Sequence, residues 1–219
     1  MSVAVQPVSY PPRMPLVPVH RFTVDEYHRM IAAGILDEND RVELLEGWIV
    51  SKMAHNPPHD SMIDLAYAEV ETCLPAGWYL RVQSAITTDD SEPEPDLAAV
   101  RGPRGRYRNQ HPRAQDIAMA VEVSDTTLSH DRHYKGPLYA RARIPVYWIV
   151  NLPQSRIEVY TDPSGPDPAP GYRQEHIYDI DESVPVVVEG REVGRIEVRK
   201  LFAGGNLEGR NHGDDESRV

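Results

Sequence analysis

The sequence has few of the features that mark secreted or membrane-spanning proteins. Its single cysteine, Cys73, excludes an internal disulfide and suits a reducing cytoplasm. No run of about 18 apolar residues is present, so no membrane-spanning helix is expected, and residues 1–18 lack the basic start and apolar block of a signal peptide. We therefore expect a cytoplasmic protein that makes no membrane contact.

Basic residues are also scarce, with 23 Lys and Arg against 34 Asp and Glu and a formal net charge of −11. This balance disfavours nucleic acid, because phosphate binding usually leaves a basic surface. Five arginines nevertheless share one short segment that has no acid: Arg101, Arg104, Arg106, Arg108 and Arg113. Since a guanidinium binds two phosphate oxygens at once, this segment is a candidate DNA contact. The alternative, a solvated surface loop, stays open.

The length of 219 residues fits one domain with tails. Residues 1–19 carry five prolines and are predicted to form a flexible arm. Residues 203–219 have few apolar side chains and are predicted to be a disordered tail. The intervening residues 20–202 are expected to form a single folded domain.

The hydrophobic pattern predicts a mixture of helices and strands. Residues 22–34 form a helix that begins with a Thr23–Glu26 capping box, and residues 41–52 form a hairpin that turns at Glu46-Gly47. Residues 59–74 and 131–143 have helical periodicity. The predicted strands are 78–87, 96–100, 117–123, 146–150, 156–161, and three further strands at the sheet edge, 172–180, 184–188 and 195–198.

The segment 117–123 is almost continuously apolar, which is typical of a central strand covered on both faces. It leads through the helix 131–143 to the strand 146–150, so these elements form a βαβ unit. The whole pattern predicts an α/β fold with a mixed central sheet flanked by helices. A helix–hairpin–helix–strand segment leads into this sheet, and the C-terminal part is rich in strands.

Two carboxylates mark the predicted site. Asp96 opens one short strand, and Glu122 lies at the end of the next apolar run. A buried carboxylate is costly unless it is paired or binds a metal, and Mg²⁺ commonly takes one or two carboxylates with water and phosphate. The carbonyl of Val123 is a further candidate ligand, and Lys135 could orient the attacking water or neutralise the phosphate. Alternatively, the carboxylates are solvated and Lys135 pairs with Asp131.

These residues resemble a known nuclease motif. Pro95-Asp96, Glu122-Val123-Ser124 and Lys135 resemble the PD-(D/E)xK motif in a form with a migrated lysine. More narrowly, the chain resembles the Uma2 family, also known as DUF820, over about residues 20–200. The matching signatures are Val42–Gly47, Pro58-His59, Val121–Ser124 with Thr127, Asp131 and Lys135, and Tyr139 with Val146–Val150.

The resemblance implies a restriction-endonuclease-like fold and Mg²⁺-dependent hydrolysis of phosphodiester bonds, with Mn²⁺ as a possible substitute. It adds Glu43 as a water-bridged metal contact, with a solvated strand glutamate as the alternative. His59 could contact phosphate or act as an acid near neutral pH, or it could be a helix-start residue with no such role. One departure is Ser124, which stands where the wider superfamily has its lysine. Lys135 must therefore reach back from its helix.

Four further residues are assigned supporting roles, namely Ser124, Asp131, Tyr139 and Gln83. Asp131 could orient Lys135 or form a plain surface ion pair, and Gln83 could line the site or sit at an edge. The first hypothesis is a DNA endonuclease that acts as a homodimer. The alternatives are a catalytically silent nuclease-fold module that binds nucleic acid or a protein partner, and a hydrolase of RNA or small phosphoesters.

Overall fold

The structure, a computed structural model, describes residues 18–54 and 56–202. The predicted tail, 203–219, and all but the last two residues of the predicted arm lie outside this range. Within it, no helix combines the length and the apolar character needed to cross a membrane. The elements are α1 (Val24–Ala32), β1 (Val42–Leu45), β2 (Trp48–Ser51), α2 (Pro57–Cys73), β3 (Trp78–Val82), β4 (Leu97–Arg101), β5 (Ile117–Ser124), α3 (Leu128–His130), α4 (Gly136–Arg141), β6 (Val146–Asn151), β7 (Arg156–Pro163), β8 (Tyr172–Tyr178), β9 (Ser183–Val188), β10 (Arg191–Glu197) and α5 (Val198–Phe202).

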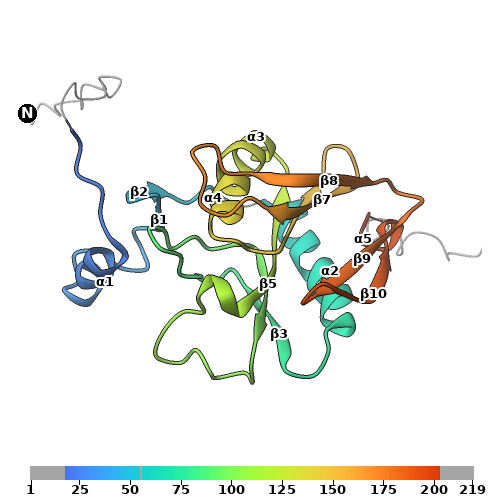
Figure 1. Cartoon of the computed structure of the whole chain (residues 1–219), viewed down its shortest axis with the longest axis horizontal. Coiled ribbons are helices and arrows are strands. Elements are labelled where there is room, and N and C mark those ends of the chain that lie inside the picture. The colour runs from blue at the N-terminus through green and yellow to red at the C-terminus, as the bar shows by residue number, and fades with distance from the viewer. Residues whose placement is uncertain (1–17, 55, 203–219) are drawn as a thin grey trace, which may run out of the picture.

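A six-stranded mixed sheet in the order β3-β4-β5-β6-β7-β8 forms the centre of the molecule (Figure 1). Strands β5 and β6 are parallel and all other neighbours are antiparallel. The parallel pair is joined through α3 and α4, which confirms the predicted βαβ connection. The predicted mixed sheet flanked by helices is likewise confirmed.

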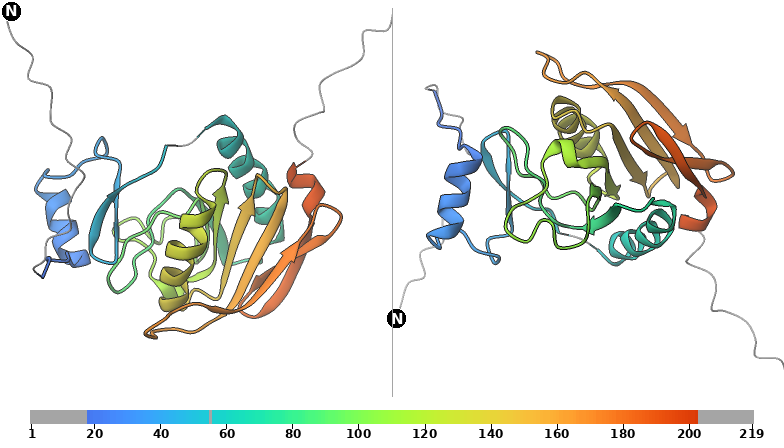
Figure 2. Two further views of the ribbon diagram at one scale, coloured as in Figure 1. Left: turned by 90° about the horizontal axis from the view of Figure 1, so that it is seen from above. Right: turned by 60° about the horizontal axis from the view of Figure 1, so that its bottom comes forward.

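Side chains alternate between two apolar cores, as expected for strands covered on both faces. On β4, Leu97 packs into the core that contains α2 and β9, whereas Ala98 packs into the core that contains α4. On β6, Trp148 and Tyr147 divide in the same way. Figure 2 shows α2 and α4 on opposite sides of the sheet. A polar side chain on β5 that faces α4 is therefore buried.

The N-terminal helix and hairpin match their predicted positions. The Thr23–Glu26 capping box is present at the start of α1. Both turn residues of the hairpin, Glu46 and Gly47, have positive φ angles of 50° and 78°, which suits the tight turns that join two-residue hairpins. A Cβ on Gly47 would lie 2.6 Å from Arg21 Cβ, so this position also needs the absence of a side chain.

Three predicted elements are wrong in extent or place. The strand predicted over 78–87 ends at Val82, because Gln83 takes a positive φ of 41° and its N–H donates to the Asp96 carbonyl at 3.0 Å. The strands predicted over 184–188 and 195–198 do not extend the main sheet. Instead, β9 and β10 form a separate two-stranded sheet, since the valines of β9 bury one face against the core of α2.

The helix predicted over 131–143 is not continuous. Residues Asp131–Lys135 form a π-helical turn between α3 and α4, closed by the Gly136 N–H donating to the Asp131 carbonyl. Pro137 explains the interruption, because it has no N–H for the carbonyl four residues before it and its ring crowds that carbonyl. A π-helical turn is uncommon and is often found at functional sites.

Candidate active site

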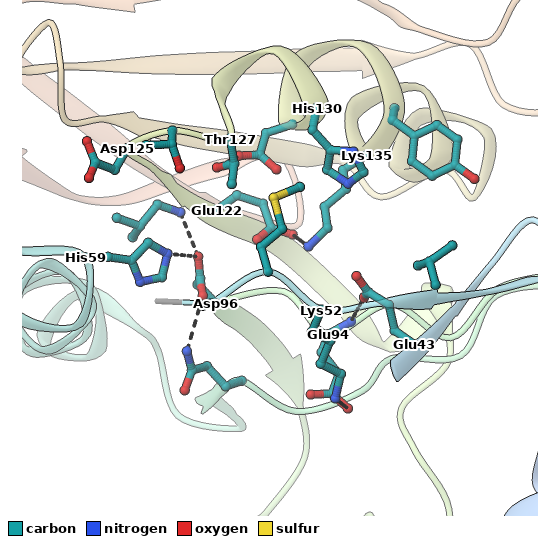
Figure 3. Close-up of a pocket in the computed structure, with 18 of the residues that line it drawn as sticks. Glu43, Lys52, His59, Glu94, Asp96, Glu122, Asp125, Thr127, His130 and Lys135 are labelled. Atoms are coloured by element: carbon teal, nitrogen blue, oxygen red, sulfur yellow. Dashed lines mark hydrogen bonds and ion pairs between the residues drawn. The ribbon is translucent and has the colours of Figure 1, made fainter. Parts of the chain in front are cut away.

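A cavity of about 370 Å³ opens beside the C-terminal end of β5. Its walls come from the β1–β2 hairpin, the start of α2, the segment before β4 and the turn between α3 and α4. Figure 3 shows Glu43, Asp96, Glu122 and Lys135 around a common space. The cavity lining includes every residue predicted to be catalytic or to bind the metal: Glu43, His59, Asp96, Glu122, Val123 and Lys135.

Strand register brings the two carboxylates together. In the antiparallel β4–β5 pair, Leu97 lies opposite Val121, and continuing this register by one residue sets Asp96 opposite Glu122. Asp96 Oδ2 accepts the backbone N–H of Val123 at 2.8 Å, which ties the start of β4 to the end of β5. Both carboxylates are buried, with 6% of Asp96 and 4% of Glu122 exposed.

Glu122 has two hydrogen-bond donors, and both reach the same oxygen. Its Oε1 accepts from Lys135 Nζ at 2.9 Å and from Tyr139 Oη at 2.7 Å, while no described residue donates to Oε2. Burial, aided by the negative charge of Asp96 and opposed by Lys135, raises the pKa of Glu122 to about 8. The carboxylate is therefore poised to gain charge when a cation approaches.

Lys135 reaches back from the π-helical turn to β5, as the departure at Ser124 requires. Burial alone lowers the pKa of this lysine, but the negative charges of Glu122 and Glu43 outweigh burial, so its pKa is raised. The ammonium group consequently stays protonated inside the cavity. Tyr139 lies one helical turn later, and burial beside Glu122 raises the pKa of its hydroxyl.

Asp131 holds the π-helical turn rather than pairing with Lys135. Its Oδ2 accepts from Ser124 Oγ and from Thr127 Oγ1, each at 2.6 Å. Tyr147 Oη also donates to the Asp131 backbone carbonyl at 3.2 Å. Ser124 and Asp131 thus join the end of β5 to the turn that carries Lys135.

His59 and Asp96 form a second polar pair. His59 Nε2 lies 3.3 Å from Asp96 Oδ2, and Gln83 Nε2 lies 3.5 Å from Asp96 Oδ1. Burial alone raises the pKa of Asp96, but the contacts with His59 and the Val123 N–H outweigh burial and lower it. Burial lowers the pKa of His59, and Asp96 overcomes this effect so that the net shift is upward. Asp96 is therefore ionised and lies next to an imidazole that can take up a proton.

Glu43 lies on the hairpin that covers the cavity. It is buried, with 6% exposed, and its Oε2 accepts the backbone N–H of Glu94 at 3.0 Å. Glu94 in turn pairs with Lys52 at 2.6 Å. The alternative of a solvated strand glutamate therefore does not describe Glu43, whose charge acts on Lys135 inside the cavity.

The cavity is strongly acidic. Six carboxylates line it against two lysines, and both lysines are already paired with carboxylates. In the described part of the chain, no three His, Cys, Asp or Glu side chains are placed to hold a metal ion by themselves. A cation with one or two carboxylate ligands and a water shell, as Mg²⁺ prefers, fits Asp96 and Glu122 because Glu122 Oε2 has no described hydrogen bond.

The arginine segment lies at the other end of β4 from the cavity. Asp96 precedes this strand and Arg101 ends it, a separation of about 17 Å along the chain. Three of the arginines form ion pairs, namely Arg101 with Glu189, Arg104 with Glu71, and Arg106 with Asp116. A DNA contact through this segment, including Arg108 and Arg113, stays a prediction and requires a substrate that extends along β4.

The structure adds residues to the cavity that the sequence did not single out as site residues. Lys52 and Glu94 close one side of it as an ion pair, and the rings of His130 and Tyr134 line it at a centroid separation of 5.2 Å. The four-residue spacing of His130 and Tyr134 indicates a shared helix face. The sequence has no pattern that joins Lys52 to Glu94.

The sequence model of the Uma2 family, described as "Putative restriction endonuclease", matches residues 24–193. The chain belongs to the Uma2 family. A crystal structure of "a putative nuclease belonging to DUF820" from Anabaena variabilis resembles this Uma2 protein with a TM-score of 0.59 and 16% identity. The alignment covers 83% of this chain and 98% of the other, so the two share a fold. No curated protein matches the sequence.

Proposed function

We propose that this Uma2 protein is a Mg²⁺-dependent endonuclease that hydrolyses phosphodiester bonds in DNA and accepts Mn²⁺ as a substitute. Family membership supports nuclease activity. The observation that carries the finer proposal is the convergence of Asp96, Glu122 and Lys135 on one acidic cavity. Such a cavity repels a bare phosphate but attracts a divalent cation.

Asp96 and Glu122 would hold the ion, with the carbonyl of Val123 as a third oxygen. When bound, a divalent ion lowers the pKa of its water and stabilises negative charge on phosphoryl oxygens. Lys135 supplies a fixed positive charge next to Glu122, where it can orient the attacking water or neutralise the phosphate. Tyr139 holds Glu122 Oε1 in place.

His59 and Glu43 assist from opposite walls. The upward-shifted pKa of His59, caused by Asp96 against the effect of burial, allows the imidazolium to contact a phosphate or donate a proton to the leaving oxygen. Glu43 adds negative charge near Lys135 and would contact the ion through water. The proposed roles of His59 and Glu43 in the reaction require the bound ion. The contact between His59 and Asp96 does not require it.

The test is cleavage of labelled and supercoiled DNA with Mg²⁺, with Mn²⁺ and with a chelator. We expect Asp96→Asn and Glu122→Gln each to lower the cleavage rate by about 10²-fold to 10³-fold. Glu192→Gln, an exposed glutamate on β10 in an ion pair with Arg195, is the matched control and should cleave normally. Cleavage that survives the chelator, or an active Glu122→Gln protein, would contradict the proposal.

One observation favours a second candidate, a nuclease fold that binds without cutting. Burial raises the pKa of Glu122 to about 8, so at neutral pH a metal must displace a proton from this carboxyl group, and Lys135 already donates to its Oε1. This alternative predicts DNA or protein binding that does not depend on a divalent ion. A panel of duplex DNA, RNA and small phosphoesters, run with Lys135→Ala as a control, separates it from a hydrolase.

A homodimer would place two cavities on the two strands of a duplex, as double-strand cleavage requires. Light scattering on the purified protein, alone and with DNA, tests this part of the proposal. A monomer in both conditions that makes only single-strand nicks would contradict it, while leaving the hydrolytic proposal intact.

A further inference from the structure

Two aromatic rings in the cavity have no part in the hydrolytic chemistry described above. His130 and Tyr134 lie on the turn from α3 into the π-helical segment, and both line the cavity. Their ring centroids are 5.2 Å apart with an interplanar angle of 37°. Both residues therefore contribute ring atoms to the cavity wall.

Aliphatic side chains of the hairpin and the loop after it complete this part of the lining. Tyr134 and Val50 pack against the same buried cluster, which contains Leu45, and all three residues line the cavity. Met53 also lines it and is 45% exposed. Methionine is unbranched and polarizable, and it adapts readily to a flat ring. We call the five residues Leu45, Val50, Met53, His130 and Tyr134 the ring slot.

The charge of the ring slot suits an uncharged aromatic group. Burial lowers the pKa of His130, while Asp131 raises it and Lys135 lowers it further, so the net shift is downward. The imidazole is therefore mainly neutral near pH 7 and is better suited to stacking than to binding a phosphate. Both lysines of the cavity are also paired, so a long run of phosphates finds no free ammonium group there.

We propose that the ring slot takes one unpaired nucleobase of the substrate, so that the enzyme acts on DNA with an unpaired nucleotide beside the scissile phosphate. The inference rests on the proposed nuclease function and names its substrate class. A cavity of about 370 Å³ lies in the range that encloses a small organic group, whereas a duplex cannot enter it. Enzymes that take a base out of the stack hold it between aromatic and apolar side chains.

The test is equilibrium binding, by fluorescence anisotropy, of one labelled DNA strand in three forms. These are the single strand, its perfect duplex, and the duplex with a one-nucleotide bulge, all in Ca²⁺ to limit cleavage. We expect the single strand and the bulged duplex to bind more tightly than the perfect duplex. Tyr134→Ala should weaken binding of these two DNAs by about 5-fold to 150-fold, the range for loss of one base–aromatic stack.

Matched variants separate stacking from folding. Tyr134→Phe keeps the ring and should retain the preference for the single strand and the bulged duplex over the perfect duplex. His130→Ala should reduce this preference. Tyr178→Ala removes a tyrosine from another histidine–tyrosine pair, His176–Tyr178, whose centroids are 4.3 Å apart on β8 and outside the cavity. It should leave the preference unchanged. Melting curves identify any variant that fails to fold, in which case His130→Ala and Tyr134→Phe carry the test.

Equal affinity for the perfect duplex and the single strand would overturn the inference, as would an equal loss for all three DNAs in Tyr134→Ala. If metal-dependent cleavage of perfect duplex is abolished by Asp96→Asn but unaffected by Tyr134→Ala, the ring slot inference fails and the nuclease proposal stands. If the wild-type protein neither binds nor cuts any DNA, both fail.

Discussion

Two buried glutamates in one row of the sheet have pKa values that are shifted in opposite directions. Glu122 on β5 is in register with Ile149 on β6, and Ile149 is in register with Glu158 on β7. Each glutamate reaches a basic residue of the same π-helical turn, Lys135 for Glu122 and Arg132 for Glu158. Burial raises the pKa of Glu122 to about 8, whereas the pKa of Glu158 falls to about 2 although burial alone would raise it.

The difference lies in the number and direction of the donors. Glu158 accepts from Arg132 Nε at 2.8 Å, Asn151 Nδ2 at 2.7 Å and Tyr160 Oη at 2.9 Å, and Arg156 adds a second guanidinium at 3.2 Å. Glu122 has two donors on one oxygen. A buried carboxylate with all its oxygens satisfied is a structural anchor. One with an oxygen left over is suited to a cation.

The largest expected difference between the two clusters is in cleavage rate. Lys135→Met should lower the rate by about 10²-fold to 10³-fold, because it removes the fixed positive charge from the cavity. Arg132→Met removes a positive charge from the same turn but acts at Glu158. Single-turnover cleavage, measured well below the melting temperature of each variant, should therefore change only a few-fold in Arg132→Met. Equal losses in the two variants would show that Lys135 acts only through the fold.

The free energy of unfolding should depend more on Glu158 than on Glu122, the reverse of the order expected for the cleavage rate. Glu158→Gln leaves two guanidinium groups without their carboxylate and should lower the free energy of unfolding by about 3 kcal/mol, the lower end of the range for a broken buried pair, because both arginines are partly exposed. Glu122→Gln should lower it by less, about 1 kcal/mol, since burial already disfavours a negative charge on this carboxyl group and the charge of Glu43 still acts on the Lys135 ammonium group. Urea denaturation measures both. The reverse ranking would contradict the division into anchor and site.

Much of the site followed from the sequence because strand pairing is regular. An apolar run that ends in Glu122 and a short strand that begins after Asp96 meet by simple antiparallel register. The Glu158 cluster could not be predicted, since its donors come from β6, β7 and the π-helical turn. The π-helical turn was not predicted either, although Pro137 in the sequence explains why the helix is interrupted there. The arginine segment suggested free basic charge, but two of its ion partners, Glu71 and Glu189, are distant in sequence.

The pH dependence of stability separates the two carboxylates in the metal-free protein. Burial raises the pKa of Glu122 from 4.5 to about 8, so its contribution is fully present below about pH 4.5 and is lost as the pH rises toward 8. Hydrogen bonds from Arg132 and Asn151, opposed by burial, lower the pKa of Glu158 to about 2. Its contribution is present above about pH 4.5 and is lost as the pH falls toward 2.

Unfolding free energies measured from pH 3 to pH 9 test this pair of signs. The wild-type protein should lose stability between pH 5 and pH 8 more steeply than Glu122→Gln does. The acid side of the profile should be flatter in Glu158→Gln. Parallel profiles for the wild-type protein and Glu122→Gln between pH 5 and pH 8 would show that Glu122 titrates normally.

The smallest effect is expected from single hydroxyl groups. Tyr139→Phe removes one donor from Glu122, and Tyr160→Phe removes one from Glu158. Each should cost about 1 kcal/mol of stability, the usual value for one hydrogen bond. Only Tyr139→Phe should also lower the cleavage rate, by about fivefold to tenfold, because only it leaves Glu122 less well held. Matched rates in the two variants would remove Tyr139 from its positioning role.

Mn²⁺-dependent thermal stabilisation tests the metal site most directly. The account predicts that saturating Mn²⁺, at about 100 times its dissociation constant, stabilises the wild-type protein by about 2.7 kcal/mol. The shift should persist in Glu158→Gln and Glu192→Gln and disappear in Asp96→Asn and Glu122→Gln. An undiminished shift in the last two variants, or no shift in the wild-type protein, would contradict a metal site built from Asp96 and Glu122.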